Sequence, residues 1–162
     1  MVAELDAALA HYAQIAERAT GQPIAESPGA GAAGGLGAGL RFFTPAVLRP
    51  GVEIVLEAVG FDARVKDAAF VLTGEGRTDF QTAFGKAPVG VAKAAKRYRV
   101  PVFCISGGLG EGADEILAQG IDAVMSICDK PMHLAECIDD AEALIEAAAA
   151  RLCRIIKASR TV

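Results

Sequence analysis

A short polar segment, LTGEGRTDFQTAFGKAP at residues 72–88, carries the side chains in this chain that are best suited to chemistry. Arg77 can bind a carboxylate or phosphate through two parallel hydrogen bonds, and Lys86 can supply a point charge near a helix start. Glu75 and Asp79 can hold Mg²⁺ through oxygen atoms or orient a hydroxyl group. This mixture predicts an anionic ligand handled together with a metal. The alternative is an internal Arg77–Asp79 salt bridge that only orders the loop.

A glycine-rich segment, PGAGAAGGLG at residues 28–37, is a second candidate site. Gly29, Gly31 and Gly34 match the spacing GxGxxG, but Glu26-Ser27-Pro28 precedes them instead of a strand, which argues against a dinucleotide-binding fold. One interpretation is a flexible or tightly packed segment. The other is a backbone that approaches a ligand closely, because glycine permits positive φ and N–H groups at a helix start attract anions.

A third candidate is the glycine pair Gly107-Gly108, which follows the apolar run VPVFCIS. The carboxyl ends of parallel strands are where α/β folds bind ligands. The pair therefore fits either a ligand contact or an ordinary turn between a strand and a helix.

The predicted secondary structure that positions these residues changes along the chain, from mostly helical to alternating strands and helices. Three short apolar runs, each followed by a loop and a helical pattern, predict parallel strands in βαβ units. We therefore expect an α/β fold in which a mostly helical, glycine-rich segment over residues 1–60 precedes an α/β lobe over residues 61–162. The predicted strands are 68–73, 100–106 and 123–128, and the predicted helices are 2–20, about 33–43, 45–60 with a break at Pro50-Gly51, and 133–157.

Composition narrows the class of protein. The 162 residues include 16 basic and 20 acidic side chains, and this net charge of −4 argues against a nucleic-acid surface. No apolar run is long enough for a membrane span, and the first residues lack the pattern of a signal peptide, so a cytoplasmic location is expected. The cysteines lack CxxC spacing and lie in apolar runs, which favours reduced, buried thiols over disulfides or zinc; they are Cys104, Cys128, Cys137 and Cys153.

Three long segments together resemble the C-terminal part of bacterial-type glycerate kinases. They are PGAGAAGGLG, LRPGVEIVLEAVG and LTGEGRTDFQTAFGKAPVGVAKAAKRYRVPVFCISGGLG, and the resemblance covers nearly the whole chain. It implies phosphorylation of D-glycerate with ATP and Mg²⁺. It also implies a three-layer, flavodoxin-like or Rossmann-like parallel-sheet lobe into which a second lobe is inserted, with the active site between the two. Residues 1–60 would then be the end of the inserted lobe.

The resemblance assigns roles to the candidate residues. Arg77, Asp79 and Lys86 become the catalytic candidates, and Glu75 and Asp79 the metal ligands. Phe80 and Phe84 depart from the commonest family pattern, and Phe84 would remove a possible general base or ligand. The substrate- or nucleotide-binding candidates are Gly29, Gly31, Gly34, Gly35, Gly74, Glu75, Gly76, Gln81, Thr82, Gly107 and Gly108.

The resemblance also implies a longer protein, because family members carry an N-terminal half that holds further strands and motifs. We therefore expect little kinase activity from the 162 residues by themselves, and self-association or pairing with the missing N-terminal half. The alternative function is a non-catalytic module that binds glycerate, phosphate or a nucleotide, or one half of a split enzyme.

Overall fold

A computed structural model describes residues 1–159 of the chain. By internal contacts the chain divides into two compact units, Met1–Pro50 and Gly51–Val162. This division falls earlier than the boundary after residue 60 expected from the sequence, because the two helices that follow Pro50 group with the sheet. Among the described residues, none of the helices is both long enough and apolar enough to cross a bilayer.

The first unit is built from two helices, α1 (Val2–Thr20) and α2 (Ala32–Phe43). The helix predicted over residues 2–20 is confirmed, and it ends where Gly21 adopts a left-handed conformation with φ 71°. The loop beyond it is held by Glu17, whose Oε1 accepts hydrogen bonds from the backbone N–H groups of Ile24 and Ala25 at 2.8 and 2.9 Å. A small core forms between the helices from Ala16, Ile24, Ala30, Ala38 and Phe42, with Tyr12 packed against it.

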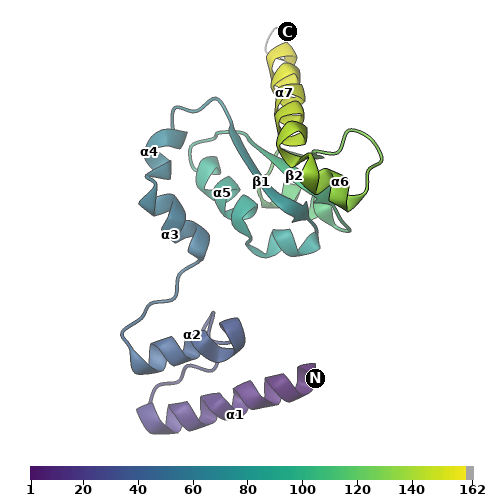
Figure 1. Cartoon of the computed structure of the whole chain (residues 1–162). Helices are drawn as coiled ribbons and strands as arrows, with labels where there is room; N and C mark the ends of the chain where they lie inside the picture. Colours follow the sequence, from purple (N-terminus) through teal and green to yellow (C-terminus); the bar gives the residue numbers. More distant parts are fainter. Residues whose placement is uncertain (160–162) are drawn as a thin grey trace. The chain divides into compact units, whose positions relative to one another are not determined.

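The second unit is an α/β fold around a parallel sheet of three strands in the order β1-β2-β3 (Figure 1). The α/β class and the parallel sheet predicted from the sequence are confirmed. Its elements are α3 (Gly51–Ala58), α4 (Phe61–Val65), β1 (Val71–Thr78), the 3₁₀ helix η1 (Phe80–Phe84), α5 (Ala87–Lys96), β2 (Val102–Leu109), the 3₁₀ helix η2 (Ala113–Gln119), β3 (Ala123–Ser126), α6 (Leu134–Asp139) and α7 (Ala141–Ser159).

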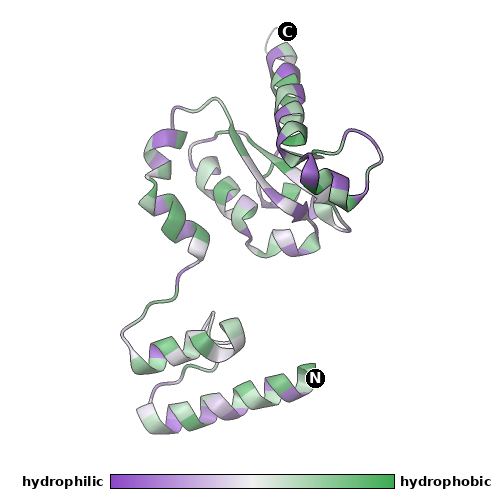
Figure 2. Ribbon diagram, in the orientation of Figure 1, coloured by the Kyte–Doolittle hydropathy of each residue, from purple (hydrophilic) through white to green (hydrophobic). Residues whose placement is uncertain are grey.

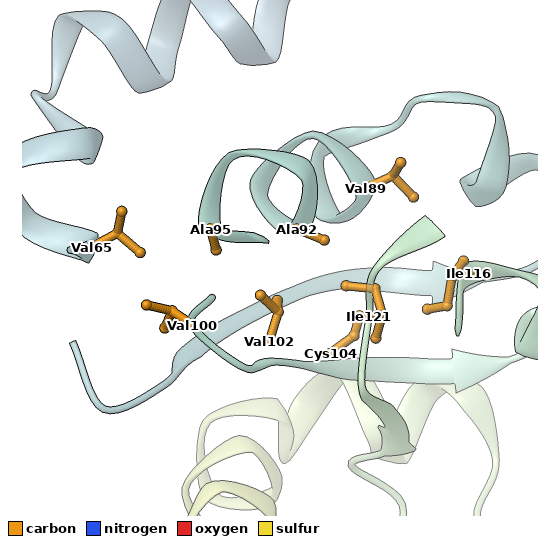
Figure 3. Close-up of a cluster of buried hydrophobic side chains, with 9 residues drawn as sticks. All are labelled: Val65, Val89, Ala92, Ala95, Val100, Val102, Cys104, Ile116 and Ile121. Atoms are coloured by element: carbon orange, nitrogen blue, oxygen red, sulfur yellow. The ribbon is translucent and has the colours of Figure 1, made fainter. Parts of the chain in front are cut away.

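Helices pack on both faces of this sheet. Alternate residues of β2 point to opposite faces, as in any strand. Val102 and Cys104 are buried in the main core with α5, whereas Ile105 packs with Leu144 and Ala148 of α7. Figure 3 shows the main core, which consists of Val65, Val89, Ala92, Ala95, Val100, Val102, Cys104, Ile116 and Ile121. The result is a three-layer arrangement.

The strands differ from the sequence prediction mainly at their carboxyl ends. β1 runs to Thr78 and β2 to Leu109, so segments predicted to be loops are hydrogen-bonded strand. Glycine is poorly suited to strands by itself, but parallel pairing between β1 and β2 overrides that preference. The hydropathy of β1 also changes along the strand, from hydrophobic at its start to hydrophilic toward its end (Figure 2).

The helices also differ from the prediction in two places. Residues 45–50 are irregular, and α3 begins at Gly51, the position of the predicted break. The long final helix is divided at Asp140 into α6 and α7. The Asp140 carbonyl oxygen accepts a hydrogen bond from the Leu144 N–H at 3.0 Å, so the residue closes one helix and opens the next. Aspartate is a preferred residue at such helix starts.

Candidate functional site

Two of the predicted site glycines have a packing role within the sheet. A Cβ atom on Gly74 would overlap the Ile105 carbonyl oxygen, and one on Gly107 would overlap the Gly76 carbonyl oxygen. These positions therefore need glycine because β1 and β2 approach each other closely. Ligand binding is not required to explain them.

Two other glycines of the same strands are not explained by packing. Apart from the glycine itself and the residues next to it in the chain, no described atom lies within 4 Å of a Cβ atom added to Gly76 or Gly108. Both backbones border the large cavity described below. A small residue at such a position suits close approach of a ligand to the backbone.

Asp79 is the centre of the polar segment. It caps the start of η1, where its Oδ1 accepts a hydrogen bond from the Gln81 N–H at 3.0 Å and its own N–H donates to the Thr82 hydroxyl at 3.2 Å. The same carboxylate lies 3.6 Å from Lys86 Nζ and 4.0 Å from Arg77 Nε. The structure therefore brings these predicted residues together. Thr82 is completely buried and serves the cap.

The two cations remain accessible beside Asp79. The side chain of Arg77 is 71% exposed and that of Lys86 is 42% exposed, whereas that of Asp79 is only 21% exposed. Exposed ion pairs at these separations contribute less than about 1 kcal/mol to stability. The internal salt bridge thus exists, but it leaves N–H donors of both cations available to an anion.

A hydrogen-bond chain under this segment was not predicted from the sequence. Thr78 Oγ1 donates to Glu75 Oε1 at 3.0 Å, and the same oxygen is hydrogen-bonded to the Ser106 hydroxyl. Since the one proton of Thr78 goes to the carboxylate, Ser106 must donate to Thr78. Cys104 Sγ lies 3.6 Å from Ser106 Oγ, and burial raises the pKa of this thiol, so it stays protonated and can donate in turn.

This chain of hydrogen bonds fixes one oxygen of Glu75 from the face of the sheet that packs against α5. Its buried members, Thr78, Cys104 and Ser106, are completely excluded from solvent. The only signal in the sequence is the alternation of Cys104 and Ser106 along β2. That alternation becomes informative only once the register with β1 is known.

A cavity of about 1060 Å³ opens along the other face of β1 and β2. Its polar edge includes Glu75 and Arg77. Its apolar wall comes from residues that follow β3 and from α6 and α7, including Met132, Leu134 and Ile138. Six of the predicted site residues line this cavity, namely Gly74, Glu75, Gly76, Arg77, Gly107 and Gly108. Four others of the polar segment do not line it, namely Asp79, Gln81, Thr82 and Lys86.

The glycine-rich segment lies in the first unit and has unusual backbone geometry. Gly29, Gly34 and Gly35 have φ values of 85°, 69° and 93°, which glycine accepts readily. Ala33 also has a positive φ of 50°, a conformation that costs a residue with a Cβ atom about 1–2 kcal/mol. Gly31 has an ordinary φ of −75°, and a Cβ there would have no neighbour within 4 Å among the described residues.

A second, smaller cavity lies beside this segment within the first unit. Its volume is about 360 Å³, and it is lined by residues that include Tyr12, Glu26, Ala30, Gly31 and Gly35. Gly31 therefore faces open space, which leaves room for a ligand to approach its backbone. Gly35, in contrast, is explained by its positive φ and by packing, because an added Cβ would lie 2.9 Å from Leu9.

Comparison with known proteins identifies a family. Residues 1–157 match the model of the glycerate kinase family. A glycerate kinase of Halalkalibacterium halodurans is 53% identical over 91% of this chain, and one of Bacillus subtilis is 43% identical over all of it. A crystal structure described as that of a glycerate kinase 2 from Salmonella typhimurium LT2 superposes over 97% of this chain with a TM-score of 0.70 and 39% identity. The chain spans about two fifths of these proteins, namely 39%, 42% and 40% of their lengths.

Proposed function

The chain belongs to the glycerate kinase family, and we propose that it provides part of the active site for ATP-dependent phosphorylation of D-glycerate to phosphoglycerate. The observation that carries the proposal is the pair of accessible cations, Arg77 and Lys86, held on either side of the Asp79 carboxylate. Two glycines without a packing role, Gly76 and Gly108, border the cavity that Arg77 also lines.

The proposed chemistry follows from what these side chains can do. Phosphoryl transfer needs positioning and neutralisation of charge on the transferred group more than it needs covalent catalysis. Arg77 can form two parallel hydrogen bonds to phosphate oxygens, and Lys86 adds a point charge. Asp79 keeps both cations in place before the ligand arrives, because it is itself fixed as the cap of η1. Gly76 and Gly108 let the ligand approach the backbone of the sheet.

The donor set of the segment fits Mg²⁺ in part. Within residues 1–159, no cluster of three or more Asp, Glu, His or Cys side chains could hold a metal ion. Magnesium in phosphoryl-transfer sites often uses only one or two carboxylates together with substrate phosphates and water. Glu75 would be the main ligand, since Asp79 already accepts from the Gln81 N–H and faces two cations. The ion would neutralise charge on the phosphates.

We further propose that the chain needs additional protein for full activity. It spans about two fifths of its relatives' lengths, and several apolar residues along the large cavity are exposed. Leu134 is 76%, Ile138 65% and Ile145 51% accessible to solvent. These exposed apolar residues would be covered either by the remaining part of a kinase or by a second copy of this chain. The alternative, a binding module without catalysis, rests on the same difference in length.

The experiment that tests the proposal is a chimera. The residues of the Halalkalibacterium halodurans relative that match this chain are replaced by this chain, and ADP release is measured with D-glycerate. Turnover on the order of 1–100 per second is expected for a kinase, with little from the 162 residues alone. A folded chimera without glycerate-dependent ADP release would reject the proposal. Calorimetric binding of D-glycerate or ATP by the chain, without turnover in the chimera, would favour the binding module.

A further inference from the structure

Two cysteine thiols lie side by side next to the large cavity. Cys128 follows β3, Cys137 belongs to α6, and their Sγ atoms are 3.5 Å apart. Both thiols are free and partly accessible, and both line the cavity. The other two cysteines can serve as controls for the accessibility of a thiol, because Cys104 is buried and Cys153 is exposed.

The distance between the two sulfur atoms can be closed by a small movement. A disulfide bond joins sulfur atoms about 2 Å apart, so roughly 1.5 Å remains. Residues 127–133 form neither helix nor strand, and α6 has only six residues. Such an irregular segment and a short helix adjust more easily than a long element in the core.

We propose that Cys128 and Cys137 form a reversible dithiol–disulfide site that reacts with small-molecule disulfides such as oxidised glutathione. The thiolate of Cys128 attacks one sulfur of the small disulfide, whose S–S bond breaks and releases one thiol. The Cys137 thiolate then attacks the Cys128 sulfur of the mixed disulfide and releases the second thiol. The protein loses two protons and two electrons, and the small disulfide gains them.

One contact bears on the order of attack. The hydrogen bond with Cys128 raises the pKa of the Cys137 thiol, which favours Cys137 as the thiol that reacts second. Cys128 also lies 3.5 Å from the carbonyl oxygen of Gly107, to which its S–H donates. A disulfide has no proton to donate, so oxidation removes this contact and reshapes one wall of the cavity. The proposal does not depend on the proposed kinase function.

The test uses the intact chain in glutathione buffers with increasing shares of the oxidised form. Free thiols are trapped with N-ethylmaleimide, and peptides are identified by mass spectrometry. We expect Cys128 and Cys137 to lose their label together and their peptides to become joined, with a mass lower by two hydrogen atoms. Cys153 should gain glutathione, and Cys104 should be labelled only after unfolding.

Two variants separate the internal disulfide from general thiol reactivity. Cys137→Ser should leave glutathione attached to Cys128, because the resolving thiol is gone, whereas Cys153→Ser should still form the internal bond within a monomer. Independent labelling of Cys128 and Cys137 at every ratio that modifies Cys153 would overturn the proposal. So would glutathione on both wild-type thiols without a joined peptide, or a joined peptide found only in disulfide-linked dimers.

Discussion

Asp79 holds several groups at once, so its substitution would mix effects on folding and on ligand binding. Its Oδ1 accepts from the Gln81 N–H, and its carboxylate faces both Arg77 and Lys86. Loss of a helix cap costs about 1 kcal/mol by itself. Arg77 and Lys86 are better probes, because they are exposed and their ion pairs contribute little to stability.

Arg77→Ala and Lys86→Ala should each lower kcat/KM of the chimera by about 10- to 100-fold, because a charge-assisted hydrogen bond is worth about 1.5–3 kcal/mol. Thermal stability should change little. Steady-state kinetics and thermal unfolding measure the two effects separately. Arg97→Ala is the matched control, because Arg97 forms an exposed ion pair with Asp62 at 2.7 Å, whereas Arg77 and Lys86 pair with Asp79. A loss of thermal stability with unchanged kcat/KM would instead favour the purely structural salt bridge.

Gly74 and Gly76 provide a second comparison between single residues. Gly74→Ala should lower the free energy of unfolding by about 1–3 kcal/mol, because the new Cβ would force β1 away from the Ile105 carbonyl oxygen. Gly76→Ala should leave unfolding nearly unchanged and reduce kcat/KM, since its Cβ would occupy space meant for ligand. Urea unfolding and the ADP-release assay are the measurements. Equal losses of stability in both variants would contradict this distinction.

At the scale of the elements, the sequence predicted what depends on local pattern. The helix at residues 2–20 was confirmed because its apolar spacing and the stop at Gly21 agree. The glycine-bearing ends of β1 and β2 were predicted as loops, because only pairing between distant segments makes them strands. The buried chain from Cys104 through Ser106 to Glu75 was missed for the same reason, since it depends on strand register. The site roles of Arg77, Asp79 and Lys86 remain predictions.

The contacts that Asp122 makes with β2 and α5 should make the stability of the protein depend on pH. Asp122 Oδ2 accepts from the Val102 N–H at 2.7 Å, and the Asp122 carboxylate pairs with Lys96 Nζ at 2.6 Å. Partial burial opposes the charged form of Asp122, but the hydrogen bonds from Lys96 and Val102 outweigh it, so the pKa is lowered. A lowered pKa in the folded state adds stability that is complete above the unfolded value, near pH 4, and is lost as pH falls through the folded value.

Asp122→Asn should therefore lower the free energy of unfolding at neutral pH by less than about 1 kcal/mol, because the pair with Lys96 is partly exposed. The difference from the unmodified protein should shrink as pH falls below about 4. Urea unfolding at a series of pH values measures it. Asp62→Asn is the control, since it removes an exposed ion pair that does not connect β2 to the loop before β3. A difference that grows toward acid pH would show that the sign is wrong.

At the scale of the whole molecule, each of the two units has its own core and its own cavity. The candidate residues are distributed over both. Gly31 borders the small cavity of the first unit, and Glu75, Arg77 and Gly108 border the large cavity of the second. The exposed apolar wall of the large cavity predicts that the chain self-associates.

The chain by itself should self-associate through the apolar wall formed by Leu134, Ile138 and Ile145, because exposed apolar patches favour association. Size-exclusion chromatography with light scattering should give a mass above that of the 16.7 kDa monomer. Ile138→Glu should shift the mass toward the monomer. Ile155→Glu should not, although Ile155 is 64% exposed on α7, because it does not line the cavity. A monomeric unmodified chain would refute this expectation.

The left-handed conformation of Ala33 has a consequence for local opening of the first unit. A cost of about 1–2 kcal/mol corresponds to roughly a 5- to 30-fold shift of an equilibrium toward the open form. The backbone angles of Ala33, Gly34 and Gly35 are left-handed and interrupt α2, so their amide hydrogens should exchange with deuterated water faster than those in the middle of α1. Ala33→Gly would relieve the strain and slow that exchange. The alanine therefore keeps the glycine-rich segment close to a state in which its backbone can rearrange.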